Sequence, residues 1–199
     1  NLNGGALALY SFRSISAGTV NVNLNGGAIR AQNHNATFVA VPGTFNMNVQ
    51  SGGAIFDTAG YSITLDRALL HDTALGTAAD GGLTKRGGGT LTLAAANTYT
   101  GNTTVSAGQV TVTGSITGTA SGSRFMIGNG SGTNGAMLFD MGAATASTFY
   151  GDGYGNSCDI GVNGGTGSLT LTSGAINIGA RTSGSLGSIR LGVNGTATG

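Results

Sequence analysis

The stretch LTKRGGGTLTLAAANTYTGNTTVSAGQVTVTG, from Leu83 to Gly114, decides the fold class. Within it, Leu91 and Leu93 alternate with threonine in TLTL, and Val110 and Val112 do so in QVTVTG. Alternation of apolar and polar residues is typical of a β-strand with one buried face. Glycine and asparagine separate these runs, and because both reach positive φ at low cost they indicate tight corners. The stretch therefore predicts short strands joined by sharp turns.

The same alternation recurs along the rest of the chain. In TVNVNL and TFNMNV every second residue is apolar, and asparagines stand between them. The outward positions are mostly Thr, Asn and Ser, which suit a solvated sheet face. The apolar residues expected to point inward are Val20, Val22, Leu24, Phe45, Met47, Val49, Tyr61, Ile63, Leu65, Leu169, Leu171, Ile176, Ile178, Ile189 and Leu191.

Short glycine-rich segments recur along the chain at irregular intervals. Each interval is about as long as one turn of a repeat protein. NLNGGAL begins at Asn1 and reappears as NLNGGAI at Asn23, and VQSGGAI follows at Val49. IGVNGGTGSLTL, which begins at Ile160, is echoed by LGVNGTATG, which begins at Leu191. Such repetition favours a parallel β-solenoid over a sandwich or barrel, because each turn of a solenoid stacks on the last at about 4.8 Å. We predict an all-β array of roughly eight rungs, about 35–40 Å long.

One segment leaves an alternative open. LDRALLHDTALGTAAD, from Leu65 to Asp80, has the apolar spacing of a short helix, with Asp66 as its cap and Ala68, Leu69 and Leu75 on one side. Thr73 and a glycine interrupt that pattern. A strand followed by a loop fits the rest of the chain better, and this is the structure we expect.

The composition indicates a packed, uncharged chain. Glycine supplies 39 of the 199 residues and charged residues only 8%, against typical shares of about 7% and 25%. A disordered chain is usually charged and poor in apolar residues, whereas this one is 39% hydrophobic. Collagen needs abundant proline, and Pro42 is the only one.

The charge pattern and the single cysteine narrow the range of partners. The formal net charge is +1 and the arginines are scattered, so nucleic acid is not an expected partner. No apolar run approaches the roughly 18 residues of a membrane helix, so no transmembrane segment is expected. Cys158 is alone, so an internal disulfide is excluded. One cysteine suits a chain that is exported without disulfides.

From Gly81 to Gly114 the sequence closely resembles the autotransporter-associated β-strand repeat, also called the passenger-associated transport repeat. Arg86, Gly88 and Val110 depart from the family pattern without breaking the alternation. The positions that carry the resemblance are Leu83, Thr84, Lys85, Gly87, Gly89, Thr90, Leu91, Thr92, Leu93, Asn97, Thr98, Tyr99, Thr100, Gly101, Thr103, Thr104, Val105, Gly108, Val110 and Val112.

The resemblance implies a right-handed parallel β-helix on the outside of a bacterium, either secreted or held at the cell surface. Residues 1–199 are expected to form a single array, with 81–114 as the best-matching repeat. The chain starts and stops inside the repeat pattern, so we expect a part of a longer chain or a fibre. Uncapped rungs favour self-association or continuation into neighbouring repeats.

No catalytic residue is predicted. The aspartates are interpreted as solvated turn residues, and they are Asp57, Asp66, Asp72, Asp80, Asp140, Asp152 and Asp159. His34 and His71 lack a nearby nucleophile pattern. The pair His71–Asp72 is not expected to act together, because adjacent strand residues face opposite ways.

The loop GDGYGNSCD, residues 151–159, holds the only metal candidates. Asp152, Asn156 and Asp159 offer oxygen ligands of the kind that Ca²⁺ prefers. The loop lacks the ligand number of an EF-hand, so an ordinary loop is the favoured interpretation, and no cofactor is expected. No neighbouring base marks Cys158 as reactive. The tyrosines, expected to pack in the core or at corners, are Tyr10, Tyr61, Tyr99, Tyr150 and Tyr154.

Three functions remain open from the sequence. The favoured one is an extracellular structural β-solenoid that acts as a stalk, spacer or fibre subunit and is not an enzyme. The second is an adhesin that displays a face for a glycan or a protein, which an exposed stripe of aromatic or arginine side chains would support. The third is a polysaccharide-degrading enzyme, which needs aspartates clustered on adjacent rungs.

Overall fold

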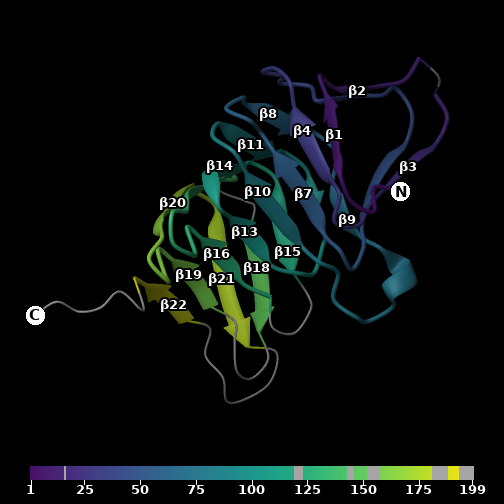
Figure 1. Ribbon diagram of the computed structural model, residues 1–199. Helices are drawn as coiled ribbons and strands as arrows, with labels where there is room; N and C mark the ends of the chain where they lie inside the picture. The colour runs from purple at the N-terminus through teal and green to yellow at the C-terminus, as the bar shows by residue number, and fades with distance from the viewer. Residues whose placement is uncertain (16, 119–122, 143–145, 152–156, 181–187, 193–199) are drawn as a thin grey trace, which may run out of the picture.

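The computed structural model describes residues 1–15, 17–118, 123–142, 146–151, 157–180 and 188–192. Within these ranges the chain is all-β apart from one short 3-10 helix, η1 (Thr73–Leu75). Every strand pairing found there is parallel, and successive coils stack from β1 (Ala6–Leu9) to β22 (Ser188–Leu191) (Figure 1). The predicted parallel β-solenoid is confirmed, whereas its right-handed sense and the number of rungs stay predictions.

Two long sheets line most of the coil, and neighbouring strands in each come from successive coils. The first sheet has eight strands, in the order β1, β4 (Ala28–Ala31), β7 (Ala54–Asp57), β10 (Leu83–Arg86), β13 (Thr103–Val105), β16 (Phe125–Ile127), β19 (Ser157–Ile160) and β22. The second has five strands, β8 (Ile63–Leu65), β11 (Thr90–Leu93), β14 (Ala107–Val112), β17 (Asn134–Asp140) and β20 (Thr166–Ser173).

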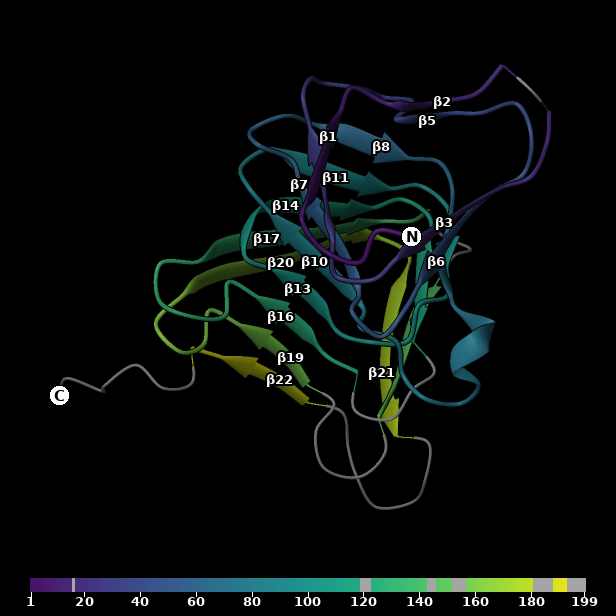
Figure 2. The ribbon, with the colours of Figure 1, turned by 45° about the vertical axis from the view of Figure 1, so that its right-hand side comes forward.

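Three smaller sheets complete the wall. One consists of β3 (Val20–Leu24), β6 (Phe45–Val49) and β9 (Leu69–His71). Another consists of β12 (Ala96–Asn97), β15 (Ser115–Gly118), β18 (Ala146–Gly151) and β21 (Ala175–Ala180). The last pairs β2 (Phe12–Arg13) with β5 (Val39–Ala40). Figure 2 shows the sheets as separate walls around a common interior.

The strand register follows two of the repeats seen in the sequence. Leu7 pairs with Ile29, so the last residues of NLNGGAL and NLNGGAI lie over one another as the repeat predicts. Ile160 pairs with Leu191, so the first residues of the later two phrases match as well. The third phrase, VQSGGAI, does not keep this match, since Leu24 pairs with Val49 before the corner and Ala28 pairs with Ile55 after it. The corner of the lower coil is therefore longer than the corner above it.

Like side chains form columns inside the coil. One inward column runs down the eight-stranded sheet through Leu7, Ile29, Phe56, Lys85, Val105, Ile127, Ile160 and Leu191. Its inner members Ile29, Phe56, Val105 and Ile127 are buried, as the stacking of apolar residues requires. Lys85 is the one polar member of this column, and it is fully buried.

The alternation predicted from the sequence holds where the coils cover one another. The burial of Leu24, Met47, Leu65, Leu91 and Val110 confirms their inward positions. In the last coils the inward residues Leu171, Ile189 and Leu191 are exposed, because no following coil among the described residues covers them. A helix capped by Asp66 does not form, and the expected strand and loop take its place as β9 and the segment after it.

The segment after β9 leaves the wall before the chain returns to β10. We call residues 72–79 the lateral loop; η1 lies within it and stands out from the side of the coil (Figures 1 and 2). Most of its residues are exposed. No helix in the described part of the chain is both long and apolar enough to cross a membrane.

Candidate functional site

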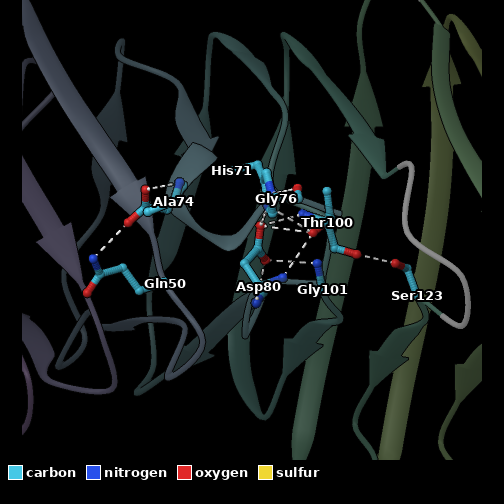
Figure 3. A network of polar contacts seen from close by, with 10 residues as sticks. Gln50, His71, Ala74, Gly76, Asp80, Thr100, Gly101 and Ser123 are labelled. Carbon is cyan, nitrogen blue, oxygen red and sulfur yellow. Dashed lines mark hydrogen bonds and ion pairs between the residues drawn. The ribbon is translucent and has the colours of Figure 1, made fainter. Parts of the chain in front are cut away.

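The strongest cluster of chemically active side chains lies at the base of the lateral loop. His71 ends β9, and Asp80 closes the loop just before β10. Nδ1 of His71 lies 2.9 Å from Oδ2 of Asp80, and the Asp80 side chain is fully buried (Figure 3). This contact closes the lateral loop at its two ends.

The Asp80 carboxylate also binds the next coil. It accepts hydrogen bonds from the backbone N–H groups of Thr100 at 2.7 Å and Gly101 at 2.9 Å. Its Oδ1 accepts a further bond from the N–H of Gly82 at 2.9 Å. The Thr100 hydroxyl donates to Oδ2 at 3.1 Å and accepts from the Asp80 N–H at 3.0 Å. One carboxylate therefore satisfies three backbone donors at a sharp corner (Figure 3).

Two glycines at this corner are required because the backbone of a neighbouring coil approaches them closely. A Cβ at Gly101 would lie 2.3 Å from the carbonyl oxygen of Asp80, and Gly101 therefore has to stay without a side chain. Gly82 has a φ of 70°, and a Cβ there would lie 2.0 Å from the carbonyl oxygen of Asn102. Both positions exclude other residues because backbone atoms of a neighbouring coil occupy the space.

The ring of His71 has an acceptor at each nitrogen. Nε2 faces the carbonyl oxygen of Gly76 at 3.2 Å, while Nδ1 faces Asp80. Desolvation alone would lower the pKa of His71, but the hydrogen bonds to Asp80 and Gly76 and the charges of Asp80 and Asp72 outweigh it and raise the pKa. The surroundings therefore favour the imidazolium form.

Asp72 takes no part in this contact. Its carboxylate accepts from the Gln50 side chain at 2.7 Å and from the N–H of Ala74 at 3.0 Å, so it caps η1. These two hydrogen bonds lower the pKa of Asp72. His71 and Asp72 therefore have different hydrogen-bond partners, and Asp72 lies just after β9 rather than on it.

The cluster has the residue types of a nucleophile triad but not its geometry. In a triad the base contacts the nucleophile through one ring nitrogen and the acid through the other. Here Thr100 and Asp80 both meet Nδ1, and Nε2 is occupied by the Gly76 carbonyl. The Thr100 hydroxyl is buried and donates to the carboxylate rather than to the imidazole. The arrangement can hold a corner together, and it offers a substrate no free nucleophile.

A second polar cluster surrounds Lys85. Its ammonium donates to the carbonyl oxygens of Arg86 at 3.0 Å, Gly87 at 2.7 Å and Ala107 at 3.0 Å. Ala107 belongs to the next coil, and Thr58 of the previous coil donates to the Gly88 carbonyl of the same turn. Burial lowers the pKa of Lys85 to about 8, and the charge of Asp57 opposes that shift. The ammonium thus ties the turn after β10 to the coil below.

A third buried polar residue, Asn97, joins three coils. Its Oδ1 accepts from the N–H of Leu69 in the coil above at 3.0 Å. Its Nδ2 donates to Ala95 in its own coil at 2.8 Å and to Ser115 in the coil below at 2.9 Å. All three amide contacts bind backbone atoms, so Asn97 fixes the vertical spacing of this corner.

Replacing Asn97 with alanine is expected to lower the free energy of unfolding by about 2–3 kcal/mol, because a buried N–H and two carbonyls lose their partner. Urea unfolding monitored by circular dichroism measures the change. Asn21→Ala is the matched control, since Asn21 is an exposed asparagine that accepts from Asn46, and it should change stability by less than about 0.5 kcal/mol. Equal losses in the two variants would contradict the bridging role.

Comparison with protein families gives a match, over residues 83–112, to the passenger-associated-transport-repeat. The chain contains a passenger-associated-transport-repeat. No curated protein and no solved structure matched in the other two comparisons. The resemblance seen in the sequence is confirmed, and the repeat indicates an autotransporter passenger-type protein that is secreted or exposed at a surface.

The passenger-associated-transport-repeat supplies three of the buried polar side chains described above. Lys85, Asn97 and Thr100 lie inside the matched residues, and each contacts a neighbouring coil. Tyr99 is buried as well, and its hydroxyl lies 2.6 Å from Oγ1 of Thr103. Burial raises the pKa of Tyr99. In this chain the polar side chains of the repeat connect coils.

The structure corrects the interpretation of two aspartates. Asp80 and Asp159 were expected to be solvated turn residues, and both are buried. Asp80 is buried because its carboxylate serves the three backbone donors of the corner. Asp66 and Asp140 keep exposed positions, as expected. The sequence missed Asp80 because its partner Thr100 is distant along the chain and comes close only when the coils stack.

The calcium candidates are only partly placed. Asp152 and Asn156 lie outside the described residues, and Asp159 lies on β19. Within the described residues no three His, Cys or Asp side chains come close enough to share a metal ion. Cys158 is buried opposite Phe125 in the interior, and burial raises the pKa of its thiol to about 12. A thiol with that pKa is a poor nucleophile at neutral pH.

The remaining ring residues divide between core and surface. Tyr99 is buried and Tyr61 packs against the core, as expected. Tyr10 is 62% exposed, so its predicted packing is wrong; the first coil has no neighbour above it among the described residues. Tyr154 and the side chain of Tyr150 lie outside the described part of the chain. His34 accepts from the N–H of Ser62 and meets Tyr61 edge-on.

Proposed function

We propose that this chain is an extracellular structural β-solenoid, a stalk, spacer or fibre subunit with no catalytic activity of its own. The observation that supports this proposal is that the buried ionisable side chains hold neighbouring coils together. His71, Asp80 and Lys85 are engaged with backbone atoms or with one another at the contacts between coils. The outward column of the second sheet carries hydroxyls in three successive coils, at Thr64, Thr92 and Thr111.

The partner in this proposal is another β-solenoid coil, either from neighbouring repeats or from a second copy of the chain. Leu7 and Leu191 stand at opposite ends of the inward column and are 44% and 68% exposed, whereas the middle of the column is buried. Exposed parallel edges with apolar inward residues invite another coil. Neighbouring repeats or a second copy of the chain would bury them. Particle length at rising concentration separates the two, because a segment that does not self-associate stays short.

The test of the stalk function uses the repeat as a length unit. Leu83 pairs with Thr103, so residues 83–102 form one coil. Duplicating them is expected to lengthen the particle by about 4.8 Å for each added coil, because the coils stack at the spacing of parallel strands. Small-angle scattering of the purified chain measures the maximum dimension over a series of duplications. An unchanged length, or cleavage of any polysaccharide in a panel, would contradict the proposal.

One patch supports the adhesin as a second candidate. Arg30, Asp57 and Arg86 occupy one outward column, and Arg30 and Arg86 are exposed. Arg30 approaches Asp57 at 3.9 Å, and this leaves an excess of positive charge on the column. Binding to a sulfated glycan array that is lost in an Arg30→Ala, Arg86→Ala double variant would favour the adhesin over the spacer.

A further inference from the structure

The lateral loop is held to the wall at three places. Its first residue, Asp72, is fixed by the Gln50 side chain of the coil above. Its middle is held through the Gly76 carbonyl, which faces Nε2 of His71. Its end is held by Asp80, which is buried in the corner of the coil below. Two of the three attachments therefore involve the same imidazole ring (Figure 3).

The hydrogen-bond directions require two donors on that ring. Asp80 Oδ2 can only accept, and so can the Gly76 carbonyl. The Thr100 hydroxyl lies 3.2 Å from Nδ1 and 3.1 Å from Oδ2 of Asp80; when its single proton is donated to the carboxylate, it presents a lone pair to the ring. Only the imidazolium has an N–H at both nitrogens. A neutral ring leaves one of these acceptors facing a lone pair.

The identity of the contact that is lost follows from the charges. The charged groups that act on the ring are Asp80 and Asp72, and both are negative. The carboxylate of Asp80 is the stronger acceptor, so a neutral His71 keeps its single N–H on Nδ1. The contact from Nε2 to the Gly76 carbonyl, which holds the middle of the lateral loop, is then lost.

We propose that His71 is a proton-dependent latch on the lateral loop. With the imidazolium in place the loop is held at Gly76 as well as at its ends. When the ring loses its proton the Gly76 side of the loop is released, while Asp80 stays in its corner. The solenoid wall is unchanged, and the already exposed lateral loop becomes free to move away from the wall as the pH rises.

The direction of the pH effect follows from linkage. The pKa of His71 is raised in the closed state, so the extra stability of closure is fully present below the ordinary value of 6.5. It is lost as the pH rises through the closed-state pKa. Each unit of difference between the closed-state and open-state pKa corresponds to an approximately tenfold change in the opening constant.

The test is limited proteolysis of the intact purified chain with elastase, which cleaves after small residues such as Ala74, Ala78 and Ala79. The rate of cleavage within residues 72–79 is divided by the rate for a free peptide of the same sequence, which removes the pH dependence of the protease. This ratio is expected to be low at acid pH and to rise with pH, with a midpoint above 6.5. His71→Gln should give a ratio that does not change with pH.

His34→Gln is the matched control, because His34 is the second histidine of the chain and lies in another corner. It should keep the rise seen in the parent protein. If His71→Gln fails to fold, the parent protein alone decides the matter through the NMR titration of the His71 ring and the hydrogen exchange of the Gly76 and Ala78 amides. A ring that titrates below 6.5, or amide protection that does not change across its titration, would overturn the latch.

Discussion

Replacing Lys85 with alanine is expected to lower the free energy of unfolding by about 3–5 kcal/mol. The loss has two causes. The carbonyls of Arg86, Gly87 and Ala107 lose their shared donor inside the protein. The aliphatic stem of Lys85 also leaves a gap in a column where Phe56 lies above it and Val105 below it. Urea unfolding with linear extrapolation gives the difference.

A methionine at position 85 separates these two causes. Lys85→Met keeps a flexible side chain of similar length and fills the column, but it supplies no donor. We expect about half the loss of the alanine variant, because the packing term is restored and the hydrogen-bond term is not. Arg86→Ala is the exposed neighbour and should change stability by less than about 0.5 kcal/mol. If alanine and methionine at position 85 both left stability unchanged, Lys85 would have no part in joining the coils.

Lys85 shows which structural features can be predicted from the sequence and which cannot. In LTKR the alternation places Leu83 and Lys85 on the same face, and both are buried. The buried position of the lysine therefore agrees with the period of two in this strand. Its partners were not readable, because Ala107 belongs to the following coil and reaches the ammonium only through the stacking of coils. The alternation predicts which way a side chain points, but it does not predict what lies opposite.

The corners were the least predictable part of the fold. The coil that joins Thr84 to its register partner Thr104 is much shorter than the coil that joins Met126 to Asp159. Variation on this scale comes from corners that tolerate insertions, so matching glycines does not give the register. Asp159 shows the consequence, since it occupies an outward position opposite Met126 and is nevertheless buried. Alternation alone predicts an exposed carboxylate there.

Replacing Asp80 with alanine is expected to have an effect of similar size, about 3–5 kcal/mol, for a different reason. The N–H groups of Gly82, Thr100 and Gly101 would lose their acceptor. The corner is buried, so a water molecule could replace the carboxylate only if the corner rearranged. His71 would lose its charge partner at the same time. The damage should be local, so hydrogen exchange of these three amides is the most direct measurement, with urea unfolding giving the total.

Two further variants make the Asp80 result specific. Asp80→Asn keeps one acceptor but places an amide N–H₂ against backbone donors, so we expect about 2–3 kcal/mol. Asp66→Ala removes a carboxylate from an exposed ion pair with Arg67, and such pairs contribute about 0–1 kcal/mol. If Asp80→Ala were no more harmful than Asp66→Ala, the corner would not depend on its carboxylate. The lateral loop would then be closed by the wall alone, and His71 would have no fixed partner against which to act.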